Sequence, residues 1–418
     1  MAYSFVRGFL TKRSFRYGQR RKESEAWPVH RQEIRRRILP GVCPAASTAK
    51  PPVKLDPLQR PLEEANQALG RLDGLASILP DPSLFIYLYV RKEAVLSSQI
   101  EGTQSSLSDL LLFESEEAPG VPLEDVQEVS TYVAAMNHGL RRLQEGFPLS
   151  LRIIREIHGI LLAHGRGSDK HPGEFRTSQN WIGPAGCTLA NATFVPPPVH
   201  EMHQALDNVE KFLHDNSFPL LIQCGLAHAQ FETTHPFLDG NGRVGRLLIT
   251  FLLCQRQALG RPLLYLSHYL KEHRAEYYDR LMAIRTDGDW EGWLKFFVRG
   301  VYEVSRAATE TARNILGLRE EHRRLLSEKM AQEKFAGASY DLTFLEYLFE
   351  QPIVTVRMAE EHLNCAFVTA NKVVERFVKL GLLEEMTGFQ RNRRFRYAPY
   401  LAMFESRPNT EVTAQKPE

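Results

Sequence analysis

The sequence predicts a mainly α-helical fold with one β-hairpin in its middle and a C-terminal winged-helix domain. Apolar residues recur at spacings of three and four over most of the chain from residue 62 onward, the pattern of amphipathic helices. Residues 171–198 interrupt this pattern with glycines and prolines that flank two short β-prone pieces. Residues 339–404 show three helical stretches followed by a two-stranded one, which is the order of a winged helix.

Breaks and caps place the individual elements. The first helix is expected from residue 62 until Pro80-Asp81-Pro82 breaks it, and the second from there to Gly102, a residue type common just past a helix end. The hairpin is expected from the pieces 180–182 and 193–195. Further helices are expected at residues 123–143, 151–164, 199–215, 219–231, 243–257, 267–285, 290–326, 341–349, 356–363 and 368–380.

Changes in composition divide the chain into five segments. Residues 1–50 are basic and lack sustained apolar periodicity, so we expect no folded role for them, although their start also resembles a transit peptide. The other segments are an N-terminal helical region (51–120), a central helical domain (121–310), a charged connecting helix (311–338) and the winged-helix domain (339–404).

Composition argues against several classes of protein. The five cysteines include no Cys-x-x-Cys pair, which disfavours a disulfide framework or zinc cluster and favours a reducing compartment. The apolar runs are shorter than the roughly 20 residues of a membrane span, so we expect a cytoplasmic protein without a membrane partner. Residues 1–40 hold eleven Lys/Arg and three Glu within a chain of net charge +2, so the remainder is acidic and has no overall attraction for nucleic acid.

The strongest functional signal is the segment 235–246, which reads His-Pro-Phe-Leu-Asp-Gly-Asn-Gly-Arg-Val-Gly-Arg. Its Gly-Asn-Gly sequence, residues 240–242, can expose successive backbone N–H groups to an anion where a helix begins. Arg243 and Arg246 are three residues apart, so they share a helix face and can fork onto phosphate oxygens.

Two further side chains complete a phosphoryl-transfer set. Asp239 offers a hard oxygen ligand for Mg²⁺, and His235 is the only group of the segment whose unperturbed pKa lies near neutrality, so it can accept a proton from an attacking hydroxyl. An ordinary turn is the simplest alternative, but no packing requirement demands all these residue types together. A metal pair of His228 and His235 is a weaker alternative, because a seven-residue spacing fits no common zinc pattern.

The segment resembles the signature of Fic-domain proteins, His-x-Phe-x-(Asp/Glu)-Gly-Asn-(Gly/Lys)-Arg-x-x-Arg, at every fixed position. The resemblance extends over about residues 51–310 and identifies 121–310 as a Fic catalytic domain with a Fic-type helical core. It implies a protein adenylyltransferase that moves AMP from ATP to a Ser, Thr or Tyr hydroxyl of a target protein and releases pyrophosphate. It also implies His235 as the base, Mg²⁺ held at Asp239, and nucleotide contacts from Asp239, Gly240, Asn241, Gly242, Arg243 and Arg246.

Two other segments support the resemblance. The hairpin resembles the family's flap, which implies that a target protein docks on residues 180–195 as an added strand and that Ile182 and Gly183 contact the nucleotide. Tyr277 resembles a tyrosine near the adenine site.

The segment 97–102, Ser-Ser-Gln-Ile-Glu-Gly, resembles the family's inhibitory motif, (Ser/Thr)-x-x-x-Glu-(Gly/Asn), with Ser97, Glu101 and Gly102 at its fixed positions. The resemblance implies that Glu101 reaches the nucleotide site and pairs with Arg246, the donor that the γ-phosphate needs. The same glutamate could instead position water for AMP removal, so deAMPylase activity remains an alternative function.

Other functions stay open at this point. Arginines at 391, 393, 394 and 396 make a basic wing, so a nucleotide-sensing, DNA-binding regulator is the main alternative. DNA is not favoured as a partner, because the third helix of the tail offers a weak set of groove-reading side chains. A transferase of another nucleotide and a homodimer are also left open.

Overall fold

The computed structural model describes residues 53–78, 82–114, 122–184, 186–333, 338–388 and 393–404. The basic segment 1–50, most of the Pro80-Asp81-Pro82 break and Arg391 therefore lie outside the described residues. The described part is mainly helical with one small antiparallel sheet, so the predicted fold class is confirmed. In these ranges no helix combines the length and the apolar character that crossing a membrane requires.

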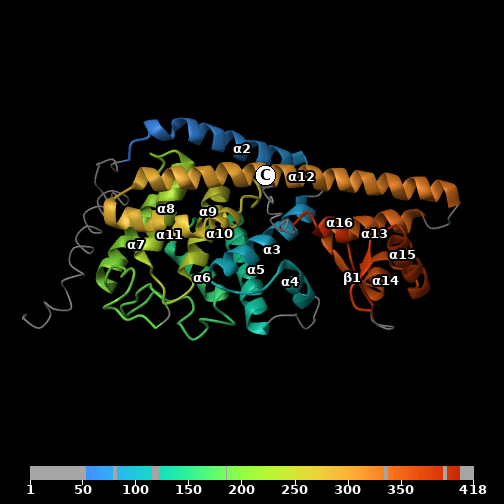
Figure 1. The fold of residues 1–418 in the computed structure, drawn as a ribbon, viewed down its shortest axis with the longest axis horizontal. Helices are drawn as coiled ribbons and strands as arrows, with labels where there is room; N and C mark the ends of the chain where they lie inside the picture. The colour runs from blue at the N-terminus through green and yellow to red at the C-terminus, as the bar shows by residue number, and fades with distance from the viewer. Residues whose placement is uncertain are drawn as a thin grey trace, which may run out of the picture.

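One long helix, α12 (Trp290–Glu333), runs along most of the molecule. Helix α2 (Gln59–Ile78) lies alongside it, and the remaining helices pack beneath the two (Figure 1). The sequence patterns predicted a helix at 290–326 and a connecting helix at 311–338, whereas α12 is continuous through residue 310. Apolar side chains are buried on one face on both sides of that point, at Ala308, Ala312, Ile315 and Leu326.

Two helices form the centre of the helical body. Almost every side chain of α8 (Leu220–Thr234) and α9 (Asn241–Gln255) is buried, as expected of helices that are surrounded on all sides. They pack against each other, and a Cβ atom at Gly139 would overlap the ring of Phe251, so this glycine lets a neighbouring helix approach α9 closely. The surrounding helices are α3 (Pro82–Ile100), α5 (Leu123–Gln144), α6 (Leu151–Leu161), α7 (Val199–Leu213) and α11 (Arg274–Asp287).

Shorter elements complete this body. They are η1 (Asp56–Leu58), α4 (Leu107–Glu114) and α10 (Ser267–Glu272). The expected hairpin is reduced to one antiparallel bridge between Ile182 and Phe194, with backbone N–H···O distances of 2.8 and 3.0 Å. No longer ladder forms among its described residues, because Pro196-Pro197-Pro198 follows directly and proline cannot donate to a ladder.

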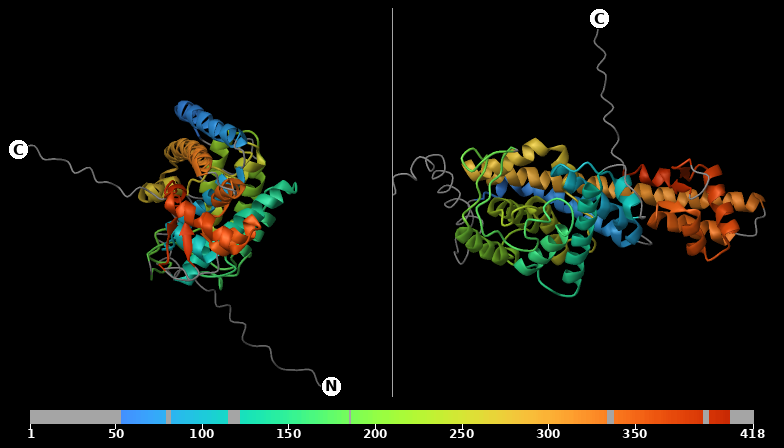
Figure 2. Two further views of the ribbon diagram at one scale, coloured as in Figure 1. Left: turned by 90° about the vertical axis from the view of Figure 1, so that its right-hand side faces the viewer. Right: turned by 90° about the horizontal axis from the view of Figure 1, so that it is seen from below.

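The C-terminal unit sits at one end of α12 in both Figure 1 and Figure 2. Its strand order is β1-β3-β2, and both pairings are antiparallel. Strand β1 was not expected: Ile353-Val354-Thr355 is a three-residue β-branched run directly before a helix, too short to stand out by periodicity. The winged-helix assignment itself stays a prediction. The unit's elements are α13 (Ala338–Glu350), β1 (Ile353–Thr355), α14 (Val356–Leu363), α15 (Phe367–Lys379), β2 (Glu384–Glu385), β3 (Arg394–Arg396) and α16 (Ala398–Leu401).

Candidate functional site

The segment 235–246 forms the junction between α8 and α9. His235 follows the last residue of α8 and adopts a left-handed conformation, with φ 47° and ψ 61°, which is uncommon for a residue other than glycine. Its carbonyl accepts a 3.0 Å hydrogen bond from Arg176 Nε and a 3.3 Å bond from Asn180 Nδ2. Two side chains from the start of the flap therefore hold the strained turn in place.

The electronic state of His235 suits a base. Its Nδ1 lies 3.3 Å from the carbonyl of Glu232, which can only accept, so the proton is assigned to Nδ1 and the lone pair to Nε2. Burial lowers the pKa of His235 to about 4, and the charge of Arg285 acts in the same direction. The imidazole is therefore neutral at physiological pH and can accept a proton.

The middle of the junction is fixed to the body by Phe237. Its buried ring stacks on His158, with centroids 3.6 Å apart and an interplanar angle of 6°. The side chain of Asn241 clamps the backbone of the same residue, because Oδ1 accepts from Phe237 N and Nδ2 donates to Phe237 O, both at 2.9 Å. The loop therefore has little freedom to move away from its neighbours.

Helix α9 presents its N-terminus at the end of the junction. Gly240 precedes the first turn with φ 76°, a left-handed conformation that favours glycine, and no side-chain hydrogen bond caps this end. Asp239 accepts from Gly240 N at 2.5 Å through Oδ1, and its side chain is 31 % exposed. Unpaired N–H groups and the helix dipole make such a terminus attractive to an anion.

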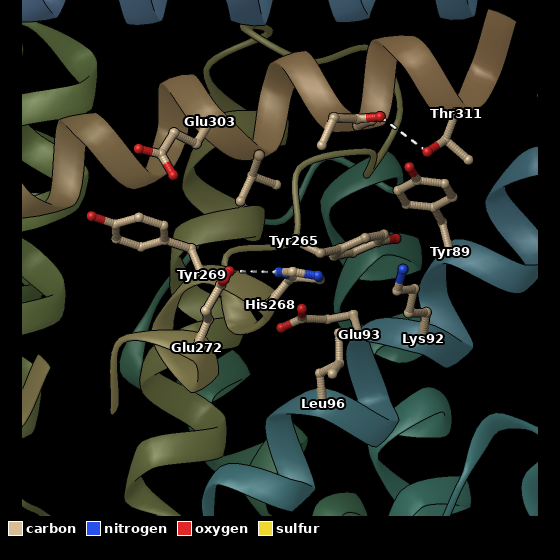
Figure 3. A pocket seen from close by; sticks show the side chains of 13 residues that line it. Tyr89, Lys92, Glu93, Leu96, Tyr265, His268, Tyr269, Glu272, Glu303 and Thr311 are labelled. Atoms are coloured by element: carbon tan, nitrogen blue, oxygen red, sulfur yellow. Dashed lines mark hydrogen bonds and ion pairs between the residues drawn. The ribbon is translucent and has the colours of Figure 1, made fainter. Parts of the chain in front are cut away.

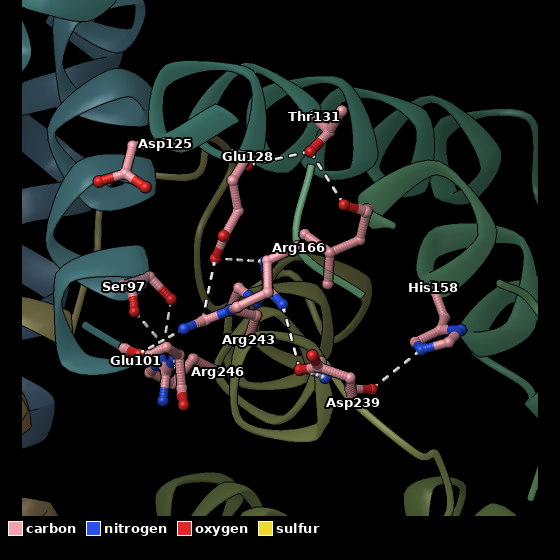
Figure 4. A network of polar contacts seen from close by, with 12 residues as sticks. Ser97, Glu101, Asp125, Glu128, Thr131, His158, Arg166, Asp239, Arg243 and Arg246 are labelled. Atoms are coloured by element: carbon pink, nitrogen blue, oxygen red, sulfur yellow. Dashed lines mark hydrogen bonds and ion pairs between the residues drawn. The ribbon is translucent and has the colours of Figure 1, made fainter. Parts of the chain in front are cut away.

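The two arginines of α9 are both held by acids (Figure 4). Arg243 is completely buried and pairs with Glu128 through Nη1 at 2.6 Å, while its Nη2 lies 3.4 Å from Asp239 Oδ1. Arg246 donates from Nη2 to Glu101 Oε1 at 2.8 Å. The guanidinium groups therefore share the inward side of α9 but meet different acidic partners.

Residue Glu101 covers the first turn of α9. Its carboxylate is so close to Gly242 that a Cβ atom there would overlap Oε1. Ser97 supports the pair, since its hydroxyl and carbonyl oxygens accept from Arg246 at 2.8 and 3.0 Å. Burial disfavours the charge on Glu101, but the attraction of Arg246 and neighbouring arginines is stronger, so its pKa is lowered and the group is ionised.

Several residues of the site were missed in the sequence. Arg166 donates to the carbonyl of Glu101 at 3.0 Å and lies 3.4 Å from the carboxylate of Glu128, so it ties the two acids together. His158 accepts from Gly173 N at 2.8 Å through Nδ1, so its Nε2 carries the proton and donates to the carbonyl of Asp239 at 3.1 Å. No local sequence signal singles these residues out, because their partners are distant in the chain.

The flap reaches the junction through Arg285. The guanidinium of Arg285 lies 3.9 Å from the ring centroid of Phe194 and donates to the carbonyl of Glu232 at 3.2 Å. This contact links the Ile182–Phe194 bridge to the end of α8, one turn from His235. At Gly183 a Cβ atom would lie 2.6 Å from Cys187 Sγ, so the flap is tightly folded at this point.

Tyr277 is buried beneath the site and donates to His228 Nε2 at 2.9 Å, while His228 Nδ1 donates to the carbonyl of Gly245 at the same distance. Both ring nitrogens of His228 are therefore used, which removes the alternative of a metal pair with His235. Among the described residues, no group of three or more His, Cys, Asp or Glu side chains is placed to hold a metal ion.

Comparison with known families gives two adjacent matches. Residues 59–141 match the Fic/DOC family N-terminal region, and residues 148–253 match the Fic/DOC family domain. The first match contains residues 97–102, helices α2, α3 and α4 and most of α5, and the second contains the complete α8–α9 junction.

Curated relatives carry the name protein adenylyltransferase Fic. The Aedes aegypti protein is 29% identical over 203 residues, which cover 47% of this chain and 37% of the relative. The Drosophila ananassae protein is 27% identical over 180 residues, which cover 42% and 33% of the two chains. The chain thus aligns with only about a third of the length of these relatives.

Two solved structures have a similar fold. A Fic family protein from Desulfovibrio desulfuricans G20 has a TM-score of 0.53 at 16% identity, with coverage of 84% of this chain and 98% of that one. A Fic domain-containing signaling protein from Bacteroides thetaiotaomicron has a TM-score of 0.50 at 18% identity, with coverage of 60% and 97%.

Proposed function

We propose that this chain, whose residues 59–141 and 148–253 match the Fic/DOC family, transfers AMP from ATP to a Ser, Thr or Tyr hydroxyl of a target protein. The observation that carries the proposal is the α8–α9 junction. There a neutral imidazole, an uncapped helix N-terminus and two buried arginines converge within twelve residues. These groups supply a base and an anion site, the two components that phosphoryl transfer needs from a protein.

Each group has a role in this proposal. His235 accepts the proton of the attacking hydroxyl, which then displaces pyrophosphate from the α-phosphorus. The N–H groups of Asn241 and Gly242 hold phosphate oxygens at the start of α9, and Arg243 and Arg246 balance their charge. Tyr277, Ile182 and Gly183 border the nucleoside part of the site, with Tyr277 fixed by its bond to His228.

The donor set around Asp239 fits Mg²⁺. Mg²⁺ is usually held by one or two carboxylates together with substrate phosphates, and Asp239 is a partly exposed carboxylate at the helix end where those phosphates would lie. Gly167 keeps the space beside it open, since a Cβ atom there would lie 2.8 Å from Asp239 Oδ2. Bound at this carboxylate, the cation would neutralise charge on the leaving pyrophosphate.

The contacts of Glu101 support autoinhibition. A triphosphate in a productive pose needs the guanidinium of Arg246 and the space over Gly242, and the Glu101 carboxylate occupies both. Ser97 and Gly102 belong to the same device: Ser97 fixes Arg246, and Gly102, with φ 105°, allows the chain to turn directly after Glu101. The alternative role of Glu101, positioning water to remove AMP, uses the same geometry.

The flap offers a docking edge for an extended target segment. Its single bridge leaves most backbone groups of residues 180–195 outside any ladder, and Trp181 is 43 % exposed beside it. A target chain that adds as a strand here would bring one of its side chains toward His235. Register along the flap would then select which hydroxyl is modified.

DNA binding gains no support from the C-terminal unit. Arg396 pairs with Glu384 at 2.8 Å, and Arg393 lies 3.8 Å from Glu385 and 4.0 Å from Glu375. The charges of Arg393 and Arg396 are therefore balanced within the unit, which reduces their availability for phosphate contacts.

The position of the transferred label tests the proposed reaction. We expect the full chain to incorporate phosphorus-32 into itself or an added lysate protein from ATP labelled at the α-phosphate, and none from ATP labelled at the γ-phosphate. The physical reason is that attack at the α-phosphorus keeps AMP and releases the other two phosphates. Labelling from the γ-phosphate alone would identify a kinase and contradict the proposal, whereas equal labelling from UTP or GTP would show that another nucleotide is the donor.

A further inference from the structure

A cavity separate from the α8–α9 junction lies between α3, α10 and α12 (Figure 3). Its volume is about 230 Å³, which is space for roughly eight water molecules at about 30 Å³ each, or for one small organic molecule. Helix α3 contributes Tyr89, Lys92, Glu93 and Leu96 to the lining, and α12 contributes mainly small apolar side chains. The mechanism proposed above makes no use of this cavity.

Two hydrogen-bond donors in the lining lack acceptors. The hydroxyl of Tyr265 is buried, with 5% of the residue exposed, and has no hydrogen-bond partner in the described part of the protein. Lys92 is only partly exposed and forms no ion pair with any described residue. Figure 3 shows the ends of Lys92 and Tyr265 on the same side of the cavity. A buried donor without an acceptor destabilises the folded state, so the Tyr265 hydroxyl is better satisfied when an acceptor enters the cavity.

The acids of the lining do not supply that acceptor. The carboxylate of Glu93 accepts bonds from the Ser267 hydroxyl and from Tyr132 at 3.2 Å, and burial raises its pKa to about 7. Glu303 accepts from Arg299 at 2.7 Å. Glu272, at the rim, lies 3.7 Å from His268. None of these carboxylates forms a hydrogen bond or ion pair with Lys92 in the described part of the protein.

The remaining walls are apolar. Val304, Ala307 and Ala308 of α12 and Leu96 of α3 also line the cavity, and the ring centroids of Tyr89 and Tyr265 lie 6.0 Å apart in a stacked arrangement. A ligand that fits has an apolar body against these side chains and an acceptor group at the Lys92–Tyr265 end. An ammonium compound would instead meet Lys92 as a like charge.

We propose that this cavity binds a small organic carboxylate with an apolar body, whose carboxylate accepts from Lys92 Nζ and the Tyr265 hydroxyl. Such a ligand contacts α3 and α12 together and stabilises their packing. Because α3 carries Ser97 and ends directly before Glu101, and both residues contact Arg246, bound ligand favours the position in which Glu101 covers α9. This last consequence rests on the proposed function, whereas the binding itself does not.

Calorimetry with 3-phenylpropionate, its neutral amide and 3-phenylpropylamine tests the binding on the full chain. We expect the carboxylate to bind about tenfold or more tightly than the other two, the difference that one charge-assisted hydrogen bond makes. No binding of the carboxylate, or equal or tighter binding of the amide or amine, would overturn the proposal.

Variants locate the site. Lys92→Met keeps the apolar stem and should abolish the preference for the carboxylate, whereas Lys211→Met, an exposed lysine on α7, should leave it unchanged. Tyr265→Phe removes only the buried hydroxyl, so it should weaken binding several-fold while the free protein melts at the same or a higher temperature. Unchanged affinity in both cavity variants would place the probe elsewhere and refute this assignment.

Amide hydrogen exchange separates the consequence for α3 from catalysis. With saturating 3-phenylpropionate, exchange of the α3 amides in the wild type should slow, and that of α15 amides should not change. Binding without slower exchange in α3 would disprove the stabilisation of α3, and this result would stand whether or not AMP transfer is observed.

Discussion

Replacing His235 by alanine will lower AMP transfer by about 10²- to 10⁴-fold, the usual contribution of a general base. The imidazole is neutral because burial lowers its pKa to about 4, and its Nε2 lone pair is free of protein partners among the described contacts. Removing the ring leaves the anion site of α9 intact, so nucleotide binding should change little. Initial rates with ATP labelled at the α-phosphate, together with calorimetry of MgATP, measure the two effects separately.

The unusual backbone of His235 requires a second variant. Alanine is strained at φ 47°, whereas asparagine adopts the left-handed conformation readily and is no base at this pH. His235→Asn should therefore keep the wild-type melting temperature and lose transfer as fully as His235→Ala. His200→Ala, at an exposed histidine on α7, serves as the matched control and should remain active. Wild-type rates in both His235 variants would rule out the imidazole as the base.

Replacing Glu101 by glycine will raise AMP transfer by roughly ten- to a hundredfold. The wild-type carboxylate accepts a charge-assisted bond of 2.8 Å from Arg246 and overlaps the space above Gly242, and a bond of this kind contributes about 1.5–3 kcal/mol. Its removal frees the guanidinium and the first turn of α9 for the γ-phosphate. Auto-modification of the full chain and labelling of lysate proteins report the gain.

Two controls show whether the charge or the helix end matters. Glu101→Gln keeps the volume and loses the charge, so we expect an intermediate rate. Glu145→Gly changes a glutamate that also directly follows a helix, α5, but lies away from α9, and should have no effect. If Glu101→Gly labelled proteins no faster than the wild type, the carboxylate would not be a brake. If the wild type removed AMP from a modified protein and Glu101→Gly did not, the deAMPylase alternative would apply.

Local sequence was sufficient to find the junction because its residue types are chemically demanding. The glycine at 240 is needed at φ 76°, and the apolar helices on both sides are long enough to be recognised from the sequence. The acidic partners of its arginines could not be found from local sequence. Glu128 lies 115 residues from Arg243 in the chain, and Glu101 lies 145 residues from Arg246; only the inhibitory motif gave a reason to expect the second pair.

Tertiary packing decides the features that the sequence did not reveal. His158 is one polar residue on the buried face of an amphipathic helix, and its role depends on Gly173 and Asp239 lying on either side of its ring. The flap has β-prone pieces of the expected kind, but the prolines after it limit pairing to one bridge. The cavity beside α3 arises where three helices meet, so no periodicity within one of them indicates it.

The central claim is that one triphosphate binds at the start of α9 and uses Arg246 once Glu101 has left it. Calorimetric titration of MgATP into Glu101→Gly and into Glu101→Gly/Arg246→Ala tests this claim most directly. We predict clear binding of MgATP to the first variant. The affinity of the second variant should be at least about tenfold lower, because a charge-assisted contact to phosphate is lost. Absence of MgATP binding to Glu101→Gly, or equal affinity of the two variants, would contradict the account.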